Sequence, residues 1–162
     1  MLFRSGAMAA GLAQMVASMS RGKKAYLQYE TQLSEAIAKL GPLREGLKAA
    51  IDADSEAYNS VVKAYRAARE NPESGEVAIT AALKQATSVP LSVAEKAREV
   101  ARIVEALGPV SNPNMKSDLT TASALARAAI EGALANVEIN LESLKDAVFA
   151  EDVKKRVAAV KA

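Results

Sequence analysis

Residues 119–148 read LTTASALARAAIEGALANVEINLESLKDAV, and this stretch decides the fold class. Apolar side chains recur along it at spacings of three and four residues, which is the period of one face of an α-helix. They are Leu119, Ala122, Ala126, Ile130, Ala133, Val137, Leu141, Leu144 and Val148. The pattern predicts one continuous helix whose apolar stripe packs against helices that run nearly parallel to it.

The composition of the chain agrees with a helical fold. Of the 162 residues, 35 are alanine and only six are aromatic. Alanine has the highest helix propensity, whereas a sheet protein uses more β-branched and aromatic residues. We therefore expect an all-α, alanine-rich bundle of about six helices, with residues 1–162 forming a single domain.

Apolar spacing elsewhere predicts the helices of the first half. One helix is expected over Gly6–Met19, and its buried stripe is Met8, Leu12, Met15 and Met19. A second run starts near Tyr26 and reaches about Ala68, with Gly41-Pro42 interrupting or kinking it. The apolar positions of this run are Leu33, Ile37, Leu40, Leu43, Leu47, Ile51, Tyr58, Val62 and Tyr65.

Turn-forming residues divide the second half. Arg69–Gly75 contains Asn-Pro and Ser-Gly and predicts a loop. Helix resumes near Ile79, is kinked or restarted at Pro90, and ends at Gly108-Pro109. A last helix is expected over Glu151–Lys161.

The residue types that are missing restrict the possible chemistry. The chain has no cysteine and no histidine, which excludes disulfides, thiolate nucleophiles, Ser-His triads and sites built on sulfur or imidazole ligands. Any catalysis must use carboxylates, lysines, tyrosines, amides and backbone groups. We expect no metal site.

Charge and hydropathy indicate the surroundings of the protein. A net charge of +2, with both signs mixed along the chain, argues against nucleic-acid binding. The apolar run Gly6–Met19 contains Gln14 and is shorter than the roughly 20 residues that span a bilayer. We therefore expect a cytoplasmic protein without a membrane partner.

Two aspartates are candidate catalytic groups. Asp118 follows Ser117 at the start of the long helix, where a carboxylate either caps free backbone N–H groups or faces a ligand in the preceding loop. Asp54 lies beside the apolar stripe and Asp52 lies nearer the solvent. Partial burial would favour the acid form of Asp54, as in proton-transfer carboxylates, although a surface position is equally compatible with the pattern.

Amides and amines are candidate binding groups. Asn136 and Asn140 are one turn apart at the edge of the stripe, where they either bond to a neighbouring helix or read the edge of a heteroaromatic ligand. Lys23 and Lys24 follow Gly22 and either flank a helix in solvent or bind carboxylates or phosphates.

Several strings taken together resemble the cyclodeaminase domain of the formiminotransferase-cyclodeaminase family, which includes methenyltetrahydrofolate cyclohydrolases. The similar strings are Gly22-Lys23-Lys24, residues 52–58 (DADSEAY), residues 86–91 (ATSVPL) with Ala94-Glu95, Asn112-Pro113-Asn114, Ser117-Asp118-Leu119, Gly132-Ala133 and residues 136–141 (NVEINL). Their order and spacing follow the family pattern over nearly the whole chain.

The resemblance implies an antiparallel bundle that dimerises through its helices and binds a tetrahydrofolate derivative as substrate, with no tightly bound cofactor. It implies one of two reactions, cyclisation of 5-formimino-tetrahydrofolate with loss of ammonia or hydrolysis of the 5,10-methenyl bridge. Asp118 and Asp54 would be catalytic, with Asp52 in support. Asn112, Ser117, Asn136 and Asn140 would contact substrate, and Lys23 and Lys24 would meet its glutamate tail.

One departure from the family pattern concerns the N-terminal region. Family members carry an extra helix and a Pro-Gly-Gly-Gly-Ser loop before the first core helix, whereas here Met1-Leu-Phe-Arg4 leads almost directly into Ser5-Gly6-Ala7. Such a loop lets backbone N–H groups approach a ligand closely. The chain is therefore expected to be N-terminally shortened, and the alternative to an enzyme is a non-catalytic, folate-binding or structural and regulatory helical subunit.

Overall fold

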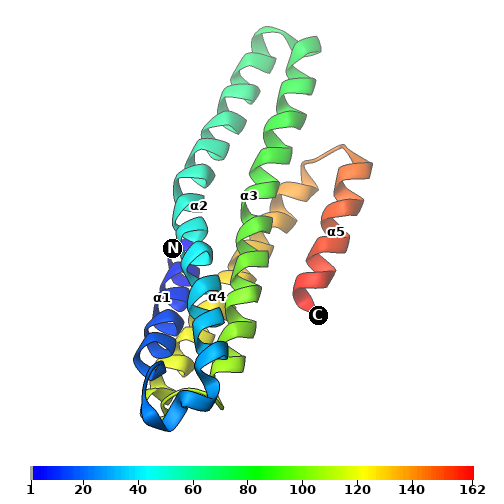
Figure 1. The fold of residues 1–162 in the computed structure, drawn as a ribbon. Helices are drawn as coiled ribbons and strands as arrows, with labels where there is room; N and C mark the ends of the chain where they lie inside the picture. The colour runs from blue at the N-terminus through cyan, green and yellow to red at the C-terminus, as the bar shows by residue number, and fades with distance from the viewer. Residues whose placement is uncertain (1) are drawn as a thin grey trace.

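The computed structural model describes residues 2–162, apart from the side chains of residues 2 and 72–74, and no strand occurs among them. Five α-helices follow one another along the chain (Figure 1). They are α1 (Leu2–Ser20), α2 (Glu30–Glu70), α3 (Pro72–Leu107), α4 (Lys116–Glu142) and α5 (Ala147–Lys161), with short 3₁₀ helices η1 (Lys24–Tyr29) and η2 (Pro113–Met115). The all-α prediction is confirmed, with five α-helices in place of about six.

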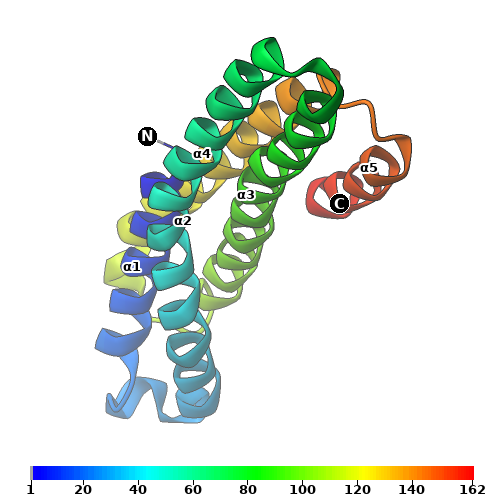
Figure 2. The ribbon, with the colours of Figure 1, turned by 90° about the horizontal axis from the view of Figure 1, so that it is seen from above.

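Helices α1 to α4 form an up-and-down bundle, and α5 packs outside it against α3 (Figure 2). Small residues allow α1 to approach its neighbours closely. Ala9, Ala10, Ala13 and Ala17 are fully buried. A Cβ on Gly6 would lie 3.2 Å from Cδ2 of Leu47 in α2 and 3.4 Å from Cβ of Ala129 in α4. The alanine-rich composition therefore acts by shortening the distances between helices.

The predicted stripe of α1 is wrong at its three methionines, whereas Leu12 is half-buried and packs against the core. Met8 and Met19 are 58% and 55% exposed, and Met15 is also exposed, while the alanines on the opposite face are buried. The same exchange occurs on α2, where Tyr58 and Tyr65 face solvent and Ala57 and Ala64 are buried. In both helices, two faces have apolar residues at the same spacing. The face with the smaller residues is buried, because the neighbouring helices pack closely against it.

The predicted loops and breaks also need correction. Asn71 alone separates α2 from α3, so most of the predicted loop Arg69–Gly75 is helical, with Pro72 at the first position of α3. There Pro is tolerated because its missing N–H would have no partner in the helix. Helices α2 and α3 run on through Pro42 and Pro90.

The long helix also ends earlier than expected. Helix α4 stops at Glu142, and Leu144 and Val148 do not continue its stripe. Asp146 caps a new helix by accepting a hydrogen bond from the Phe149 N–H at 3.0 Å. Val148 is consequently 84% exposed rather than buried.

Helix α5 is attached to α3 by apolar and ionic contacts. Val153 is fully buried with Leu91 and Val137. Arg156 forms a bidentate pair with Glu95, with nitrogen–oxygen distances of 2.8 and 2.9 Å. The two-point geometry fixes the rotation of α5 as well as its position.

Helix α3 contains the segment Gly75–Leu107, which is long and apolar enough to cross a membrane by length and composition. Its hydropathy has a structural explanation within the bundle. Leu91, Val93, Ala94 and Val100 are fully buried, and α3 packs against both α2 and α4.

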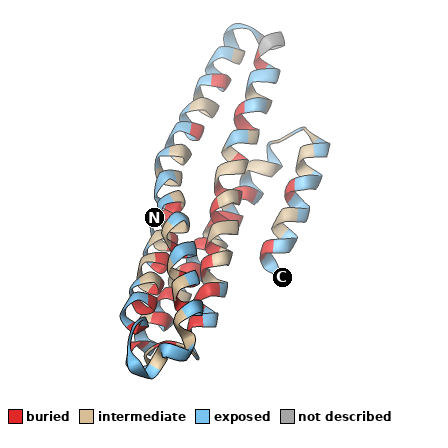
Figure 3. Cartoon of the chain, in the orientation of Figure 1, coloured by how far each residue is buried: buried red, intermediate tan, exposed pale blue. Residues whose placement is uncertain are grey.

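The distal parts of α2 and α3 form a hairpin that projects beyond α1 and α4, and buried residues become sparser toward its tip (Figure 3). The two helices touch closely at the tip. A Cβ on Gly75 would lie 2.3 Å from the Ala68 Cβ and 2.4 Å from the Ala68 Cα. A Cβ on Gly11 of α1, by contrast, would have the flexible side chain of Arg44 as its nearest neighbour from another helix, with the Arg44 Cδ at 3.8 Å.

We expect the same substitution at these two glycines to have opposite effects. Gly75→Ala should lower the free energy of unfolding by about 1–3 kcal/mol, because backbone must move to admit the methyl group. Gly11→Ala should raise it by about 0.5–1 kcal/mol, because alanine restricts the unfolded chain and favours helix. Urea unfolding of both variants measures the difference, and destabilisation of similar size in both would contradict the described packing.

Candidate functional site

Contacts of Gly6 fix the relative heights of three helices. Because Gly6 lies against both Leu47 and Ala129, these two residues are at the same level of the bundle. Asp54 and Asn136 each follow seven residues later, on helices that run in the same direction. Seven residues are two turns, so Asp54 and Asn136 lie about 10 Å further along and on the same helix faces as Leu47 and Ala129. Asp54 and Asn136 therefore lie at the same level of the bundle, near the N-terminal end of α1.

Asp54 has the environment of a proton-transfer group. Its side chain is half-buried, and burial raises the pKa of its carboxyl above the ordinary value. No hydrogen bond or ion pair to this carboxylate occurs within residues 2–162. Asp52, in contrast, is exposed on the solvent side of α2, as the sequence predicted.

Asn140 lies one turn beyond Asn136 and donates a hydrogen bond to a backbone carbonyl of α3 that has no donor within its own helix. Its Nδ2 donates to the backbone oxygen of Ala86 at 2.8 Å. That carbonyl has no helical donor because the residue four positions later is Pro90, which lacks an N–H. The interhelical bond considered for the asparagine pair is therefore made by Asn140, while Asn136 is half-buried.

The remaining candidates lie near the opposite end of α1. Asp118 is eighteen residues before Asn136 on the same helix, a separation of about 27 Å. It lies in the first turn of α4, half-buried, where its charge complements the helix dipole. The residue at the N-cap position is Met115, and α4 has no side-chain capping bond there. One chain thus places Asp54 and Asn136 at one level of the bundle and Asp118 at a distant one.

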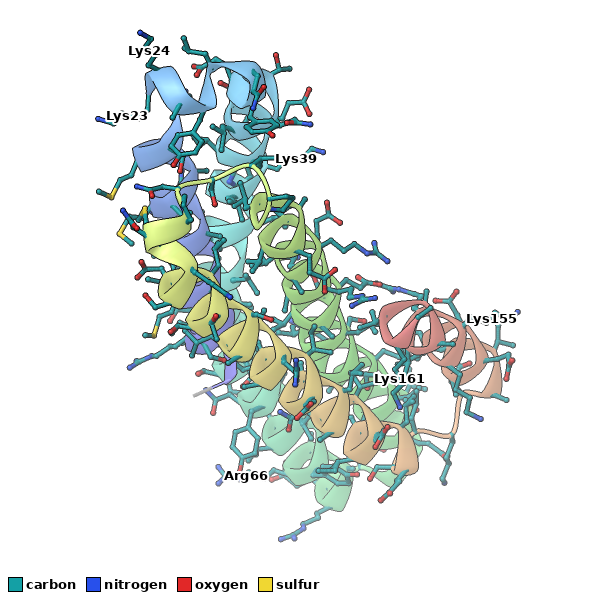
Figure 4. The ribbon with its side chains drawn as sticks, turned by 90° about the horizontal axis from the view of Figure 1, so that it is seen from below. Lys23, Lys24, Lys39, Arg66, Lys155 and Lys161 are labelled. Atoms are coloured by element: carbon teal, nitrogen blue, oxygen red, sulfur yellow. The ribbon has the colours of Figure 1, made fainter. Side chains whose placement is uncertain are left out.

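The loop before α4 is tied to the end of α1. The Asn112 N–H donates to Ser20 Oγ at 2.9 Å, and the Asn112 side chain accepts from the Asn114 N–H at 3.0 Å. Ser117 is exposed. Lys23 and Lys24 follow Gly22, which has a left-handed φ of 73°, and both amines point into solvent (Figure 4).

A groove of about 820 Å³ runs between the end of α3 and the first half of α4. Of the predicted site residues only Asn112 lines it, together with Ser111, Lys116 and Arg127 among others. The Ser111 hydroxyl is buried and lacks a hydrogen-bond partner. The sequence did not predict this groove, because the spacing of its residues is that of an ordinary helix surface. Within residues 2–162 no group of three or more metal-ligating side chains is placed to hold an ion.

Comparison with known proteins matches the chain to one family. The formiminotransferase-cyclodeaminase family matches residues 4–159. A methenyltetrahydrofolate cyclohydrolase of Methylorubrum extorquens is 36% identical over 151 residues, which are 91% of this chain and 73% of that protein. The formimidoyltransferase-cyclodeaminase of Gallus gallus is 32% identical over 94% of this chain, which spans 29% of that protein. The crystal structure of formiminotetrahydrofolate cyclodeaminase from Thermotoga maritima superimposes with a TM-score of 0.91 at 31% identity, covering 99% of this chain and 77% of that one.

Substituting Asn140 should expose its role in α3. We expect Asn140→Leu to lower the free energy of unfolding by about 1–3 kcal/mol, because the Ala86 carbonyl is left without a donor. Pro90→Ala restores an N–H to the helix, so in that background Asn140→Leu should lower the free energy of unfolding by a smaller amount. A double-mutant cycle measured by urea unfolding gives the coupling, and additive effects would show that the carbonyl freed by Pro90 is not what Asn140 serves.

The difference in stability between the Asp54→Asn variant and the parent should depend on pH in a defined direction. Because the pKa of Asp54 is higher in the folded than in the unfolded state, ionisation opposes folding, and stability is lost as the pH rises through the folded pKa. Asp54→Asn should therefore be more stable than the parent at pH 7. The difference should vanish below the ordinary aspartate pKa of about 3.9. Urea unfolding between pH 3 and pH 7 measures this, and a loss of stability at pH 7 would contradict it.

Proposed function

Because the chain belongs to the formiminotransferase-cyclodeaminase family, we propose that it is an enzyme of tetrahydrofolate one-carbon metabolism. Its reaction is hydrolysis of the 5,10-methenyl bridge or cyclisation of the 5-formimino group. The observation that carries the proposal, beside the family match, is the half-buried carboxylate of Asp54, whose pKa burial raises, at the same level of the bundle as Asn136. A carboxylate whose pKa is raised above its ordinary value is a stronger proton acceptor when it is ionised.

The proposed chemistry passes through a tetrahedral carbon between two nitrogens. In hydrolysis, water adds to the cationic methenyl carbon and gives a proton to a carboxylate. The hydroxyl of this intermediate then loses its proton and becomes the formyl C=O as the bond from the carbon to N5 breaks. N5 takes up a proton, and 10-formyl-tetrahydrofolate forms. In the cyclodeaminase reaction, N10 attacks the formimino carbon and ammonia leaves. Each route needs a group that moves protons and one that stabilises positive charge.

We assign these roles to residues as follows. Asp118 stabilises the cation or transfers the proton, Asp54 is the second proton-transfer carboxylate, and Asp52 supports the charge balance. Asn136 reads the pterin edge with its amide, and Asn140, whose Nδ2 is bonded to the Ala86 carbonyl, reads it with its amide oxygen. Asn112 and Ser117 border the site at the loop before α4. The exposed amines of Lys23 and Lys24 are free to meet the carboxylates of a glutamate tail.

We further propose that the protein acts as a cytoplasmic homodimer, with residues 1–162 as one domain and the tetrahydrofolate derivative as its only small-molecule partner. The support for a dimer is the distance of about 27 Å that separates Asp118 from Asn136 within one chain. A site that uses both groups then needs two chains. The support for a reducing compartment is weaker and consists of a sequence without cysteine.

Replacement of either aspartate should abolish most of the activity. We expect Asp118→Asn and Asp54→Asn each to lower kcat/KM by about 10²- to 10⁴-fold, the usual contribution of a positioned acid or base. Asp152→Asn on the exposed surface of α5 is the matched control and should keep the parental rate. The assay follows the absorbance of methenyl-tetrahydrofolate, with and without formimino-tetrahydrofolate as the starting compound.

The two starting compounds separate the candidate reactions. Loss of methenyl absorbance indicates hydrolysis, and its appearance from the formimino compound indicates cyclisation with ammonia release. If a folded Asp118→Asn protein has parental activity on both compounds, the role of Asp118 is wrong. If the parent binds folate and catalyses neither reaction, the non-catalytic alternative replaces the enzyme.

A further inference from the structure

Two exposed tyrosines lie on the face of α2 that packs against α1 elsewhere in the bundle. Leu47 marks this face, because its Cδ2 lies against Gly6 of α1. Tyr58 and Tyr65 follow eleven and eighteen residues later, which are about three and five helical turns, so both share the face of Leu47. Leu47 is fully buried, whereas Tyr58 is 68% exposed and Tyr65 is 46% exposed. Both rings are therefore accessible on a face that is buried at the level of Leu47.

Tyr58 lies beside the candidate carboxylate of Asp54. Residues four apart in a helix are neighbours, with Cβ atoms about 5–6 Å apart. Helical side chains also lean toward the N-terminal end of their helix, so the Tyr58 ring is directed toward the turn that contains Asp54. Tyr65 is eleven residues from Asp54, or about 16 Å along the axis. One exposed ring is therefore adjacent to the carboxylate, and the other is out of its reach.

Both candidate substrates have the same kind of charge at the reacting carbon. The 5,10-methenyl bridge is a planar cation in which one carbon joins two nitrogens. The 5-formimino group is an amidine, which is protonated near neutral pH and then forms a similar planar N–C–N cation. Cations are attracted to the face of an aromatic ring when they lie within about 6 Å of its centre, and tyrosine is one of the residues that bind them.

We propose that Tyr58 binds the planar N–C–N cation of the substrate on the face of its ring, with the Asp54 carboxylate as the counter-charge. This inference rests on the proposed function and adds to it a residue that selects charged one-carbon groups over uncharged folates. Burial is the largest cause of the raised pKa of Asp54, which indicates that the ionised carboxylate is poorly solvated. A cation bound beside this carboxylate offsets that cost.

The role of Tyr58 is compatible with the role assigned to Asn136. Asn136 lies at the level of Asp54 on α4, which runs in the same direction as α2. An amide bonds to donors and acceptors at the edge of a heterocycle, whereas an aromatic ring packs against its face. The two side chains therefore recognise different parts of one flat ligand and do not compete for the same contact.

Three variants test the assignment. Tyr58→Leu removes the aromatic face, Tyr58→Phe keeps it, and Tyr65→Leu is the matched control on the same face of α2. Tyr26 and Tyr29 pack against the hydrophobic core, but Tyr58 and Tyr65 do not, so we expect all three variants to fold like the parent. The measured quantities are kcat and KM for the methenyl or formimino compound that the parent converts. The inhibition constant of tetrahydrofolate, which lacks the charged group, is measured beside them.

We expect Tyr58→Leu to raise the KM for the cationic substrate about 3- to 30-fold, the usual range for a cation bound on an aromatic ring. Its kcat should stay within about threefold of the parental value, because the contact is already made with the bound substrate. The inhibition constant of tetrahydrofolate should change by less than about twofold, because this ligand has no cation to lose from the ring. Tyr58→Phe and Tyr65→Leu should resemble the parent.

An equal loss of affinity for tetrahydrofolate and for the cationic substrate overturns the proposal, since Tyr58 would then pack against the ligand without recognising its charge. A parental KM in Tyr58→Leu, or the same increase in Tyr65→Leu, also overturns it. If the parent converts neither compound, the proposed enzymatic function fails. Equilibrium dialysis with methenyl-tetrahydrofolate and tetrahydrofolate then applies the same comparison to the dissociation constants, and a parent that binds neither overturns the role of Tyr58 as well.

Discussion

The structure depends on the close approach of α1 to α2 and α4. Gly6 and the buried alanines of α1 let the helix backbones come near enough for Leu47 and Ala129 to touch the same turn. This contact sets the heights of α2 and α4 relative to each other. It thereby places Asp54 and Asn136 at one level, although they are 82 positions apart in the sequence. A bundle built on larger side chains would leave this alignment less well defined, because longer side chains have more ways to pack.

Periodicity predicted the helices well and their buried faces poorly. The stripe of α4 from Leu119 to Val137 is buried as expected, with Ile130 half-buried. On α1, two faces have the same period, and the methionine stripe has the greater hydrophobicity, so the sequence alone favoured the wrong one. Only the tertiary packing distinguishes them, because alanines fit between closely spaced helices and methionines do not. Likewise, Asn71-Pro72 looked like a loop because Pro at a first helical position and Pro inside a loop have the same local sequence.

The candidate site was found by residue type and resemblance, and its geometry was not predictable. Pro90 leaves the Ala86 carbonyl without a helical donor, and Asn140 supplies a donor to it. The sequence does not show this, since the bond joins α4 to α3 across 54 positions. The resemblance implies that Asp118 and Asp54 act in one catalytic site. In a single chain, however, Asp54 on α2 lies near the N-terminal end of α1, and Asp118 on α4 lies near its C-terminal end. The family relationship concerns the whole fold, with a TM-score of 0.91 to the Thermotoga maritima cyclodeaminase, and so does not by itself decide which chain supplies each group.

In the proposed dimer, one folate site is made by Asp54 and Asn136 of one chain and Asp118 of another. A crystal structure with a bound non-reactive tetrahydrofolate analogue would show which chain supplies each group. We expect the pterin ring to contact Asn136 of one subunit while the one-carbon position lies within hydrogen-bonding reach of the partner subunit's Asp118. An analogue held entirely by one subunit, or bound in the groove between α3 and α4, would contradict it.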